Sequence, residues 1–434
     1  MFPLLTRSCG AGDVAGRDGA DRCPGTVTVY QADDGGLARI RVPGGALTRD
    51  QLLALASWAR ELGNGRLELT GRGNIQLRGL AVGAEGELSE RLHQLGLLPS
   101  PAHDRARNVL ASPLSGRDGF GALDIRPLVG ELDRRLCADP ALAELPGRFL
   151  FALDDGRGDV AGLNADVALL ALPNQRVALL LGGQDSGLRL AVGQAVSGLL
   201  AAASGFLRQR PDDRTWRVAE LPGGPSRLII ELEGQLDARP GPPVSVPERD
   251  PIGPVGRIEQ SDGRFALAAS VPLGELTPAR CQVLGSVADR DVLLTPWRGV
   301  VLPDLEPAAI GRAERRLDGA GLVFDAGSPA LGISACTGKP GCAKALADVR
   351  ADASVGAGHA AGTAVEPFPG GGSGVLLPVH WSGCSRRCGR PVGPVVDVVA
   401  EPEGYRISRA GEREIVSDDV SAVRAAVTRI RAGG

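Results

Sequence analysis

Four cysteines in the last quarter of the chain have the spacing of a metal site. Cys336 and Cys342 form a C-x5-C pair, and Cys384 and Cys388 form a C-x3-C pair about forty residues later. Both pairs lie in stretches rich in Gly, Pro and Ser, which can turn several thiolates toward one point. Structural zinc sites favour short C-x2-C pairs, whereas iron–sulfur clusters are commonly held by four cysteines. The spacing favours a cluster over zinc, and over unrelated buried cysteines or disulfides.

The remaining cysteines and the histidines form no second metal motif. We interpret the scattered cysteines as small apolar residues: Cys9, Cys23, Cys137 and Cys281. No pair of histidines with a carboxylate has the spacing of a mononuclear iron site; the histidines are His93, His103, His359 and His380. His380 is the best placed because it precedes Cys384 by four residues, and we interpret it as a structural strand histidine.

Two segments of the chain repeat each other and predict the same secondary-structure elements. LARIRVPGGALTRDQLLALASWAREL, from residue 37, matches FALAASVPLGELTPARCQVLGSVADR, from residue 265, and ELTGRGNIQL matches LLTPWRGVVL. Each copy predicts a strand, a turn, a helix that begins after Thr and a further strand, with Thr48 as an N-cap. The sequence therefore predicts a duplication with pseudo-twofold symmetry.

The two copies differ in charge. The first has Arg39 and Arg41 where the second has Ala268 and Ser270, and Arg72 has a tryptophan opposite it. Arginine suits carboxylate recognition because its planar fork pairs bidentately and keeps its charge. Cations in only one of two symmetric copies predict an asymmetric anionic ligand beside that copy. For any one arginine, the alternative is a position on a strand face that is exposed to solvent.

The cysteine motif resembles that of the sirohaem-dependent sulfite and nitrite reductase superfamily, and residues 37–80 are similar to its first half-repeat. The short length, CPG at 23–25 and TPWRG at 295–299 resemble its branch in aerobic cobalamin synthesis, precorrin-3B synthase. The resemblance covers nearly all of the chain after residue 22. It implies an α+β fold of two pseudo-twofold-related halves, each a ferredoxin-like half-repeat followed by a mixed α/β domain.

The expected boundaries combine this resemblance with composition. Residues without apolar periodicity form an arm, and a proline-rich stretch forms a linker. The order is arm 1–22, first half-repeat 23–100, first α/β domain 101–237, linker 238–256, second half-repeat 257–327, and second α/β domain with the cluster 328–434. In the last domain, CAKALADVRADA at 342–353 is predicted as a helix and VLLPVHWSG at 375–383 as the strand that delivers the second cysteine pair.

The resemblance also implies the roles of individual residues. The four cysteines of the two pairs would hold one [4Fe–4S] cluster. Four arginines would bind substrate carboxylates: Arg41, Arg72, Arg107 and Arg148. The residue before the last cysteine of this motif is usually Gly, and here it is Arg387.

One departure distinguishes the branches. Sulfite and nitrite reductases carry a paired-lysine segment, LP-x-K-x-K, whose cations bind the anion and deliver protons. Here the segment is LPGRFL, with Arg148 and Leu150 at the lysine positions. Arginine does not readily release its proton, so a six-electron reduction loses both expected donors. This favours a different reaction.

The resemblance then implies oxygen-dependent hydroxylation of precorrin-3A at C20, with γ-lactone formation from the ring A acetate. The cofactors would be the [4Fe–4S] cluster and a mononuclear non-haem iron, and electrons would come from ferredoxin or an NAD(P)H-dependent reductase, since no nucleotide motif stands out. The alternatives are a sirohaem-dependent sulfite or nitrite reductase and a non-catalytic electron-transfer or tetrapyrrole-binding protein.

Composition limits the partners. A net charge of −3 and 3% aromatic residues give little basis for nucleic-acid binding. A membrane span requires about 18 consecutive apolar residues, and we find no such stretch in the sequence. We also find no signal peptide. We expect a cytoplasmic protein, because a reducing compartment preserves free thiols.

Overall fold

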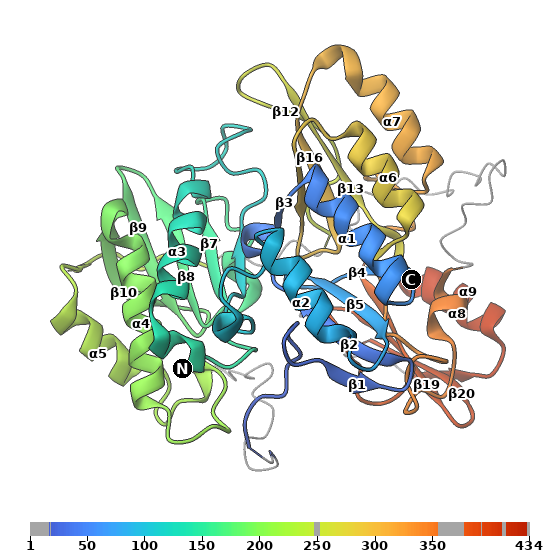
Figure 1. Cartoon of the computed structure of the whole chain (residues 1–434), viewed down its shortest axis with the longest axis horizontal. Coiled ribbons are helices and arrows are strands. Elements are labelled where there is room, and N and C mark those ends of the chain that lie inside the picture. The colour runs from blue at the N-terminus through green and yellow to red at the C-terminus, as the bar shows by residue number, and fades with distance from the viewer. Residues whose placement is uncertain are drawn as a thin grey trace, which may run out of the picture. The chain divides into compact units, whose positions relative to one another are not determined.

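The computed structural model describes residues 17, 19–246, 252–354, 377–391, 393–409 and 414–431. Most of the expected arm, part of the linker, Cys9 and His359 lie outside these residues. The chain forms two compact units (Figure 1). One comprises Met1–Pro24, Pro99–Ser112 and Gly121–Glu248, and the other comprises Gly25–Leu98, Pro113–Phe120 and Arg249–Gly434. Both half-repeats and both cysteine pairs belong to the second unit.

The second unit contains two five-stranded antiparallel sheets, and each half-repeat supplies four strands of one of them. Sheet A has the order β1 (Tyr30–Ala32), β2 (Gly35–Ile40), β5 (Ile75–Leu80), β4 (Leu67–Leu69) and β14 (Glu275–Leu276). Sheet B has the order β12 (Gly256–Glu259), β13 (Phe265–Ser270), β16 (Gly299–Leu305), β15 (Asp291–Leu294) and β3 (Ala46–Thr48). The same order in both sheets confirms the predicted repeat.

The last strand of each sheet comes from the other half-repeat. β14 pairs with β4, with Glu275 opposite Glu68, and β3 pairs with β15, with Leu47 opposite Val292. Each half-repeat therefore completes the sheet of its counterpart.

The four helices of the half-repeats share one apolar core with the two sheets. α1 and α6 pack side by side (Figure 1), and each begins at a threonine cap. Thr48 Oγ1 accepts the N–H of Gln51, whose side chain returns a bond to the Thr48 N–H, and Thr277 caps α6. The helices are α1 (Arg49–Leu62), α2 (Ala84–Gln94), α6 (Pro278–Val287) and α7 (Ile310–Gly319).

Sheet D, also in the second unit, carries the cysteine loops. Its strand order is β17 (Ile333–Ala335), β18 (Val379–Ser382), β19 (Val396–Glu401), β20 (Gly404–Ser408) and β21 (Ile415–Ser417). The first three strands are parallel. Apolar residues of α8 (Val349–Ser354) and α9 (Val420–Arg431) pack with the sheet in one core.

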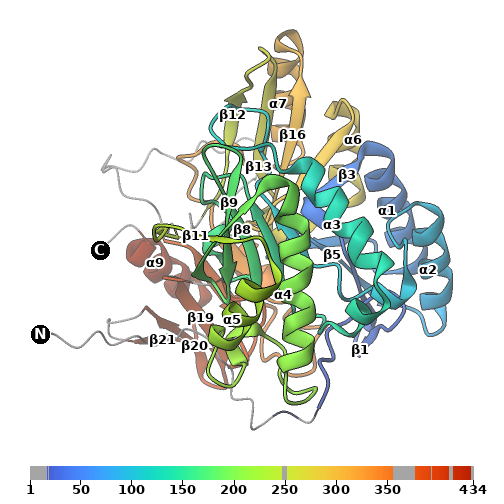
Figure 2. The same ribbon diagram turned by 90° about the vertical axis from the view of Figure 1, so that its left-hand side faces the viewer.

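The first unit contains a six-stranded mixed sheet, sheet C. Its order is β11 (Arg239–Pro240), β10 (Gln184–Ala191), β9 (Arg176–Leu181), β8 (Val167–Leu172), β7 (Phe151–Asp154) and β6 (Val109–Ala111). β6, β7 and β8 are parallel. The helices α3 (Arg126–Ala138) and α4 (Ala195–Gln209) pack against the sheet, and α5 (Ser226–Gln235) packs on α4 (Figure 2).

The helix predicted over residues 342–353 is wrong in its first half. α8 begins only at Val349. The preceding residues take an irregular path because their backbone bonds elsewhere: the Leu346 N–H donates to the carbonyl of Gly383 in the second cysteine loop. Tertiary contacts override the helix propensity of the alanines and leucine there. Within the described residues, no helix is long and apolar enough to cross a membrane.

Candidate functional site

Parallel strand pairing brings the two cysteine pairs to one edge of sheet D. Ala335 of β17 lies opposite Trp381 of β18. Cys336 follows the first strand directly, and Cys384 comes two residues after the second. Because the carboxyl ends of parallel strands meet at the same edge, the loops 336–346 and 383–388 start side by side.

The two cysteine loops are in direct contact. The Gly383 N–H donates to Cys336 Sγ at 3.1 Å, and the Gly383 carbonyl accepts the Leu346 N–H at 2.8 Å. A Cβ atom at Gly383 would lie 2.7 Å from Cβ of Ala345. The close approach of the loops therefore requires glycine at this position.

The thiols lie in a setting that suits a metal cluster. Burial raises the pKa of Cys336, the Gly383 and Gly338 N–H groups oppose this, and the negative charges of Cys388 and Cys384 raise it further. A bound metal would offset such negative charge on the thiolates that ligate it. Cys384 is half-buried and Cys388 is exposed.

The donor arrangement differs from that of a single-ion site. In the described part of the chain, no three Cys, His, Asp or Glu side chains converge on one ion position. A zinc site requires that convergence, with each sulfur about 2.3 Å from one ion, whereas a cluster spreads four thiolates over its irons. Four thiols on two adjoining loops are the donors that a cluster requires, and their assignment to one stays a prediction. The described residues provide no ligand set for the expected mononuclear iron.

His380 has no ring nitrogen available for a metal. It is fully buried on β18, with Nδ1 2.9 Å from Ser334 Oγ and Nε2 3.0 Å from the Cys388 carbonyl. Burial lowers the pKa of His380 to about 3, and the charge of Arg298 contributes in the same direction. The histidine is therefore neutral and ties the second cysteine loop to the sheet, in agreement with a structural role.

Arg387 occupies a left-handed backbone position in the second loop. Its φ is 48°, and its N–H donates to the Cys384 carbonyl at 3.2 Å. Glycine adopts this conformation without steric cost, which explains its frequency at this position of the motif. The Arg387 side chain extends toward Asp397 of β19, with 4.0 Å between Nη1 and Oδ2.

The first half-repeat braces the first cysteine loop. The buried Arg78 of β5 holds Asp34 through two bonds, at 2.9 and 2.8 Å, and also donates to the Gly341 carbonyl at 2.9 Å. Asp33 accepts the Ala343 N–H. The turn between β1 and β2 thus fixes the loop that contains Cys342.

Two of the four predicted substrate arginines lie at one end of sheet A. Arg41 directly follows β2 and is 1% exposed. Arg72 lies in the turn between β4 and β5, where Asn74 Oδ1 accepts the Val42 N–H at 2.9 Å. That bond joins the turn to the residue after Arg41. The assignment of both residues to a substrate stays a prediction.

The other two predicted arginines belong to the first unit and already have protein partners. Arg107 is buried and forms a bidentate pair with Asp133, at 2.7 and 2.8 Å. Arg148 Nε lies 3.1 Å from Asp21 Oδ1, and its guanidinium lies over the ring of Trp216 at 4.7 Å from the centroid. A substrate carboxylate would have to share or replace these contacts, and this assignment also stays a prediction.

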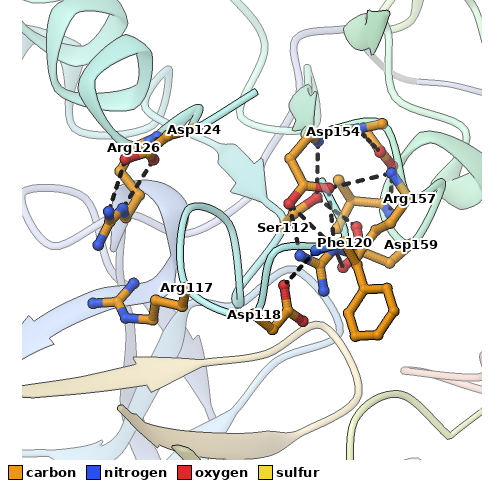
Figure 3. A network of polar contacts seen from close by, with 12 residues as sticks. Ser112, Arg117, Asp118, Phe120, Asp124, Arg126, Asp154, Arg157 and Asp159 are labelled. Carbon is orange, nitrogen blue, oxygen red and sulfur yellow. Dashed lines mark hydrogen bonds and ion pairs between the residues drawn. The ribbon is translucent and has the colours of Figure 1, made fainter. Parts of the chain in front are cut away.

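Sheet C offers an internal comparison for the cysteine loops. Ser112 follows β6 as Cys336 follows β17, and residues 155–161 follow β7 as the second cysteine pair follows β18. Ser112 Oγ donates to Asp159 at 2.6 Å, and Asp154 accepts four backbone N–H groups, those of Gly156, Gly158, Val160 and Ala161 (Figure 3). A hydrogen-bonded network of carboxylates occupies the position of the thiolates.

The structure reveals functional contacts that the sequence does not indicate. Arg298, from the second half-repeat, donates to the carbonyl of Gly389 at 2.7 Å, directly after the last cysteine. Arg350 of α8 contacts the Cys336 carbonyl and two glutamates of sheet A. Arg298 lies within TPWRG at 295–299, but the sequence does not show the partners of Arg298 or Arg350, because these partners are distant along the chain.

The comparisons with known proteins agree with this architecture. Residues 30–95 match the nitrite/sulfite reductase ferredoxin-like half domain. A precorrin-3B synthase from Sinorhizobium sp is 28% identical over 91% of this chain and 83% of its own length. A ferredoxin–nitrite reductase from Synechococcus elongatus is 27% identical over 82% of this chain and 74% of its own length.

A ferredoxin sulfite reductase from Mycobacterium tuberculosis is 25% identical over 72% of this chain and 61% of its own length. The solved structure of the Mycobacterium tuberculosis NirA protein matches with a TM-score of 0.72 at 20% identity, covering 96% of this chain and 84% of that one. The match confirms the expected α+β fold with repeated halves. The chain is therefore similar, over most of its length, to oxidoreductases of the sulfite and nitrite reductase superfamily.

Proposed function

We propose that the protein is a precorrin-3B synthase. The reaction is the oxygen-dependent hydroxylation of precorrin-3A at C20, with γ-lactone formation from the ring A acetate. One atom of O2 enters the product, and the other leaves as water after uptake of two electrons and two protons. The similarity to the Sinorhizobium synthase over most of both chains supports this assignment.

The observation that carries the proposal is the environment of residues 145–150. Leu150 is 3% exposed, its N–H donates to Asp166, and the strand β7 follows it directly. An arginine such as Arg148 does not readily release a proton. Neither residue can deliver the protons that reduction of sulfite or nitrite consumes, whereas hydroxylation by O2 has a much smaller proton demand.

The arginines would bind the carboxylates of the tetrapyrrole. Arg41 is almost fully buried where β2 ends, and its planar guanidinium fork suits a carboxylate. Arg72 can approach the same ligand from the turn beside it. We also assign Arg107 and Arg148 to substrate carboxylates; Asp133 and Asp21 contact their guanidinium groups.

Electrons would reach the substrate through a [4Fe–4S] cluster bound by Cys336, Cys342, Cys384 and Cys388. When bound, such a cluster supplies single electrons. The only two lysines of the chain, Lys339 and Lys344, are both exposed on the first cysteine loop. Positive charge beside the cluster suits an acidic electron donor such as a ferredoxin.

A sirohaem-dependent reductase is the second candidate, because nitrite and sulfite reductases match at nearly the same identity. An optical spectrum of the purified protein separates the two. We expect a broad brown absorption from the cluster, and no reduction of sulfite or nitrite with reduced ferredoxin. Strong sirohaem bands together with sulfide or ammonia formation would replace the synthase assignment with the reductase.

A further inference from the structure

A mostly buried arginine joins the first cysteine loop to the pair of strands, β4 and β14, at which the two half-repeats meet. Arg350 is the second residue of α8 and is mostly buried. Its Nη1 lies 2.7 Å from Glu68 Oε1 and 2.6 Å from Glu275 Oε1. Its Nε donates to the Cys336 carbonyl at 3.2 Å. One side chain thus connects a candidate cluster ligand to both half-repeats.

The two glutamates need this cation. Glu68 of β4 and Glu275 of β14 lie directly opposite each other in the antiparallel ladder. Like charges in that arrangement repel and destabilise the sheet. The Arg350 guanidinium lies within hydrogen-bond distance of both carboxylates and offsets this repulsion. Arg66 also contacts Glu275, at 3.3 Å.

The same contacts continue along the polar face of sheet A. Gln76 of β5 donates to Glu68 at 3.2 Å and accepts from Arg39 of β2 at 2.5 Å. Arg39 is two residues from Arg41, a proposed substrate ligand. An unbroken series of polar contacts therefore runs from the cationic face of the first half-repeat through Glu68 and Arg350 to the backbone of Cys336.

We propose that Arg350 is a positioning residue that holds Cys336 in place for cluster binding and whose positive charge raises the reduction potential of the cluster. The inference rests on the proposed assignment of Cys336 as a cluster ligand. The planar fork reaches two carboxylates and a carbonyl at once, which a lysine ammonium on a single flexible stem cannot reproduce. Cluster potentials respond to nearby charge and hydrogen bonding.

Two substitutions separate position from charge. Arg350→Lys keeps the positive charge but loses the Nε contact with Cys336. We expect its iron and sulfide content to fall severalfold, while the remaining cluster keeps the potential of the unaltered protein. Arg350→Gln removes the charge as well, so cluster content should fall and the potential of the remaining cluster should shift to more negative values.

The variants have two matched controls. Arg406 of β20 is another arginine that bridges two carboxylates, those of Glu401 and Glu414. Arg406→Gln should leave the cluster content and the reduction potential unchanged. Arg350→Gln combined with Glu275→Gln removes the uncompensated carboxylate. This double variant should recover thermal stability but not cluster content, because the Nε contact with the Cys336 carbonyl is still missing, so it keeps the test decisive where Arg350→Gln alone does not fold.

The experiment measures iron, sulfide and the midpoint potential by EPR-monitored titration of the reconstituted full-length chain. Unchanged cluster content in both Arg350→Lys and the double variant would overturn the positioning role of Arg350. An unchanged potential in Arg350→Gln would overturn the proposed effect of its charge. Absence of any cluster from the unaltered protein would overturn the proposed cluster assignment and, with it, this inference. The two failures are therefore distinct.

Discussion

The role of each arginine in the candidate site depends on the group that accepts its hydrogen bonds. Arg78 and Arg350 hold the first cysteine loop, through Gly341 and Cys336. Arg107 is fixed by Asp133. The sequence marks arginines as cations but not their partners, because Arg350 and Glu68 are separated by 282 positions. Ion pairs over such distances leave no local pattern, so Arg350 could not be predicted.

The proposed substrate arginines can be tested one at a time. Alanine at the buried Arg41 or Arg107 should weaken tetrapyrrole binding by roughly 2–5 kcal/mol, because each change leaves a carboxylate of a buried pair without its partner. Alanine at Arg72 or Arg148, which are more exposed, should weaken binding by less. The cluster spectrum should remain intact. Binding can be measured by fluorescence or absorbance titration with precorrin-3A.

Arg227→Ala on the exposed face of α5 is the matched control for these variants. Thermal unfolding should be recorded as well, because removal of Arg107 leaves Asp133 without its partner. Affinities equal to that of the control in all four variants would return these arginines to a structural or solvated role.

A second test at this scale concerns Asp159. Burial, followed by the charge of Asp154, raises the pKa of Asp159 from 3.8 to about 7. The folded protein therefore holds a proton that the unfolded chain releases, and the free energy of unfolding falls as pH rises from about 4 to 7. At about 1.4 kcal/mol for each pKa unit, the loss is at most about 4 kcal/mol.

Asp159→Asn should remove this dependence. Urea unfolding should give similar stabilities for variant and parent near pH 4.5, and a more stable variant near pH 8. The exposed Asp289→Asn serves as the control. Equal destabilisation by Asp159→Asn at both pH values would show that the raised pKa does not govern the stability of this network.

At the scale of elements, short strands and long strands differ in how well the sequence predicts them. The repeat from β2 to β5 and from β13 to β16 is visible as matching apolar alternation, and Thr48 is confirmed as a helix cap. The exchange of β3 and β14 could not be predicted, because strands of three and two residues have no measurable periodicity. The helix predicted over 342–348 is wrong for a related reason: contacts with the second cysteine loop determine the backbone path of these residues.

The prediction that the cysteine loops bind a cluster can be tested directly by mutation. Serine at any one of Cys336, Cys342, Cys384 or Cys388 should lower the iron and sulfide content, because each thiolate binds a separate iron. The quadruple serine variant should contain neither. Cys281→Ser, at a buried cysteine of α6, controls for loss of a thiol from a core. Full iron and sulfide in the quadruple variant would contradict the assignment.

At the scale of the whole molecule, duplication explains why one scaffold can have two different sites. The half-repeats share their strand order and exchange strands, so neither sheet is complete without the other. Only the first carries Arg39 and Arg41, and only sheet D carries cysteines at its parallel strand ends. The pseudo-symmetry was predictable from the repeated segments, whereas the grouping of both half-repeats with the cysteine domain in one compact unit required the structure.

Incorporation of labelled oxygen tests the central claim most directly. The purified protein, loaded with its cluster, is supplied with precorrin-3A, a reductant and 18O2, and the product is examined by mass spectrometry. The proposed synthase should place one labelled oxygen atom in the product and should form no product without oxygen. Turnover in the absence of oxygen, or an oxygen atom that derives from labelled water, would contradict the assignment.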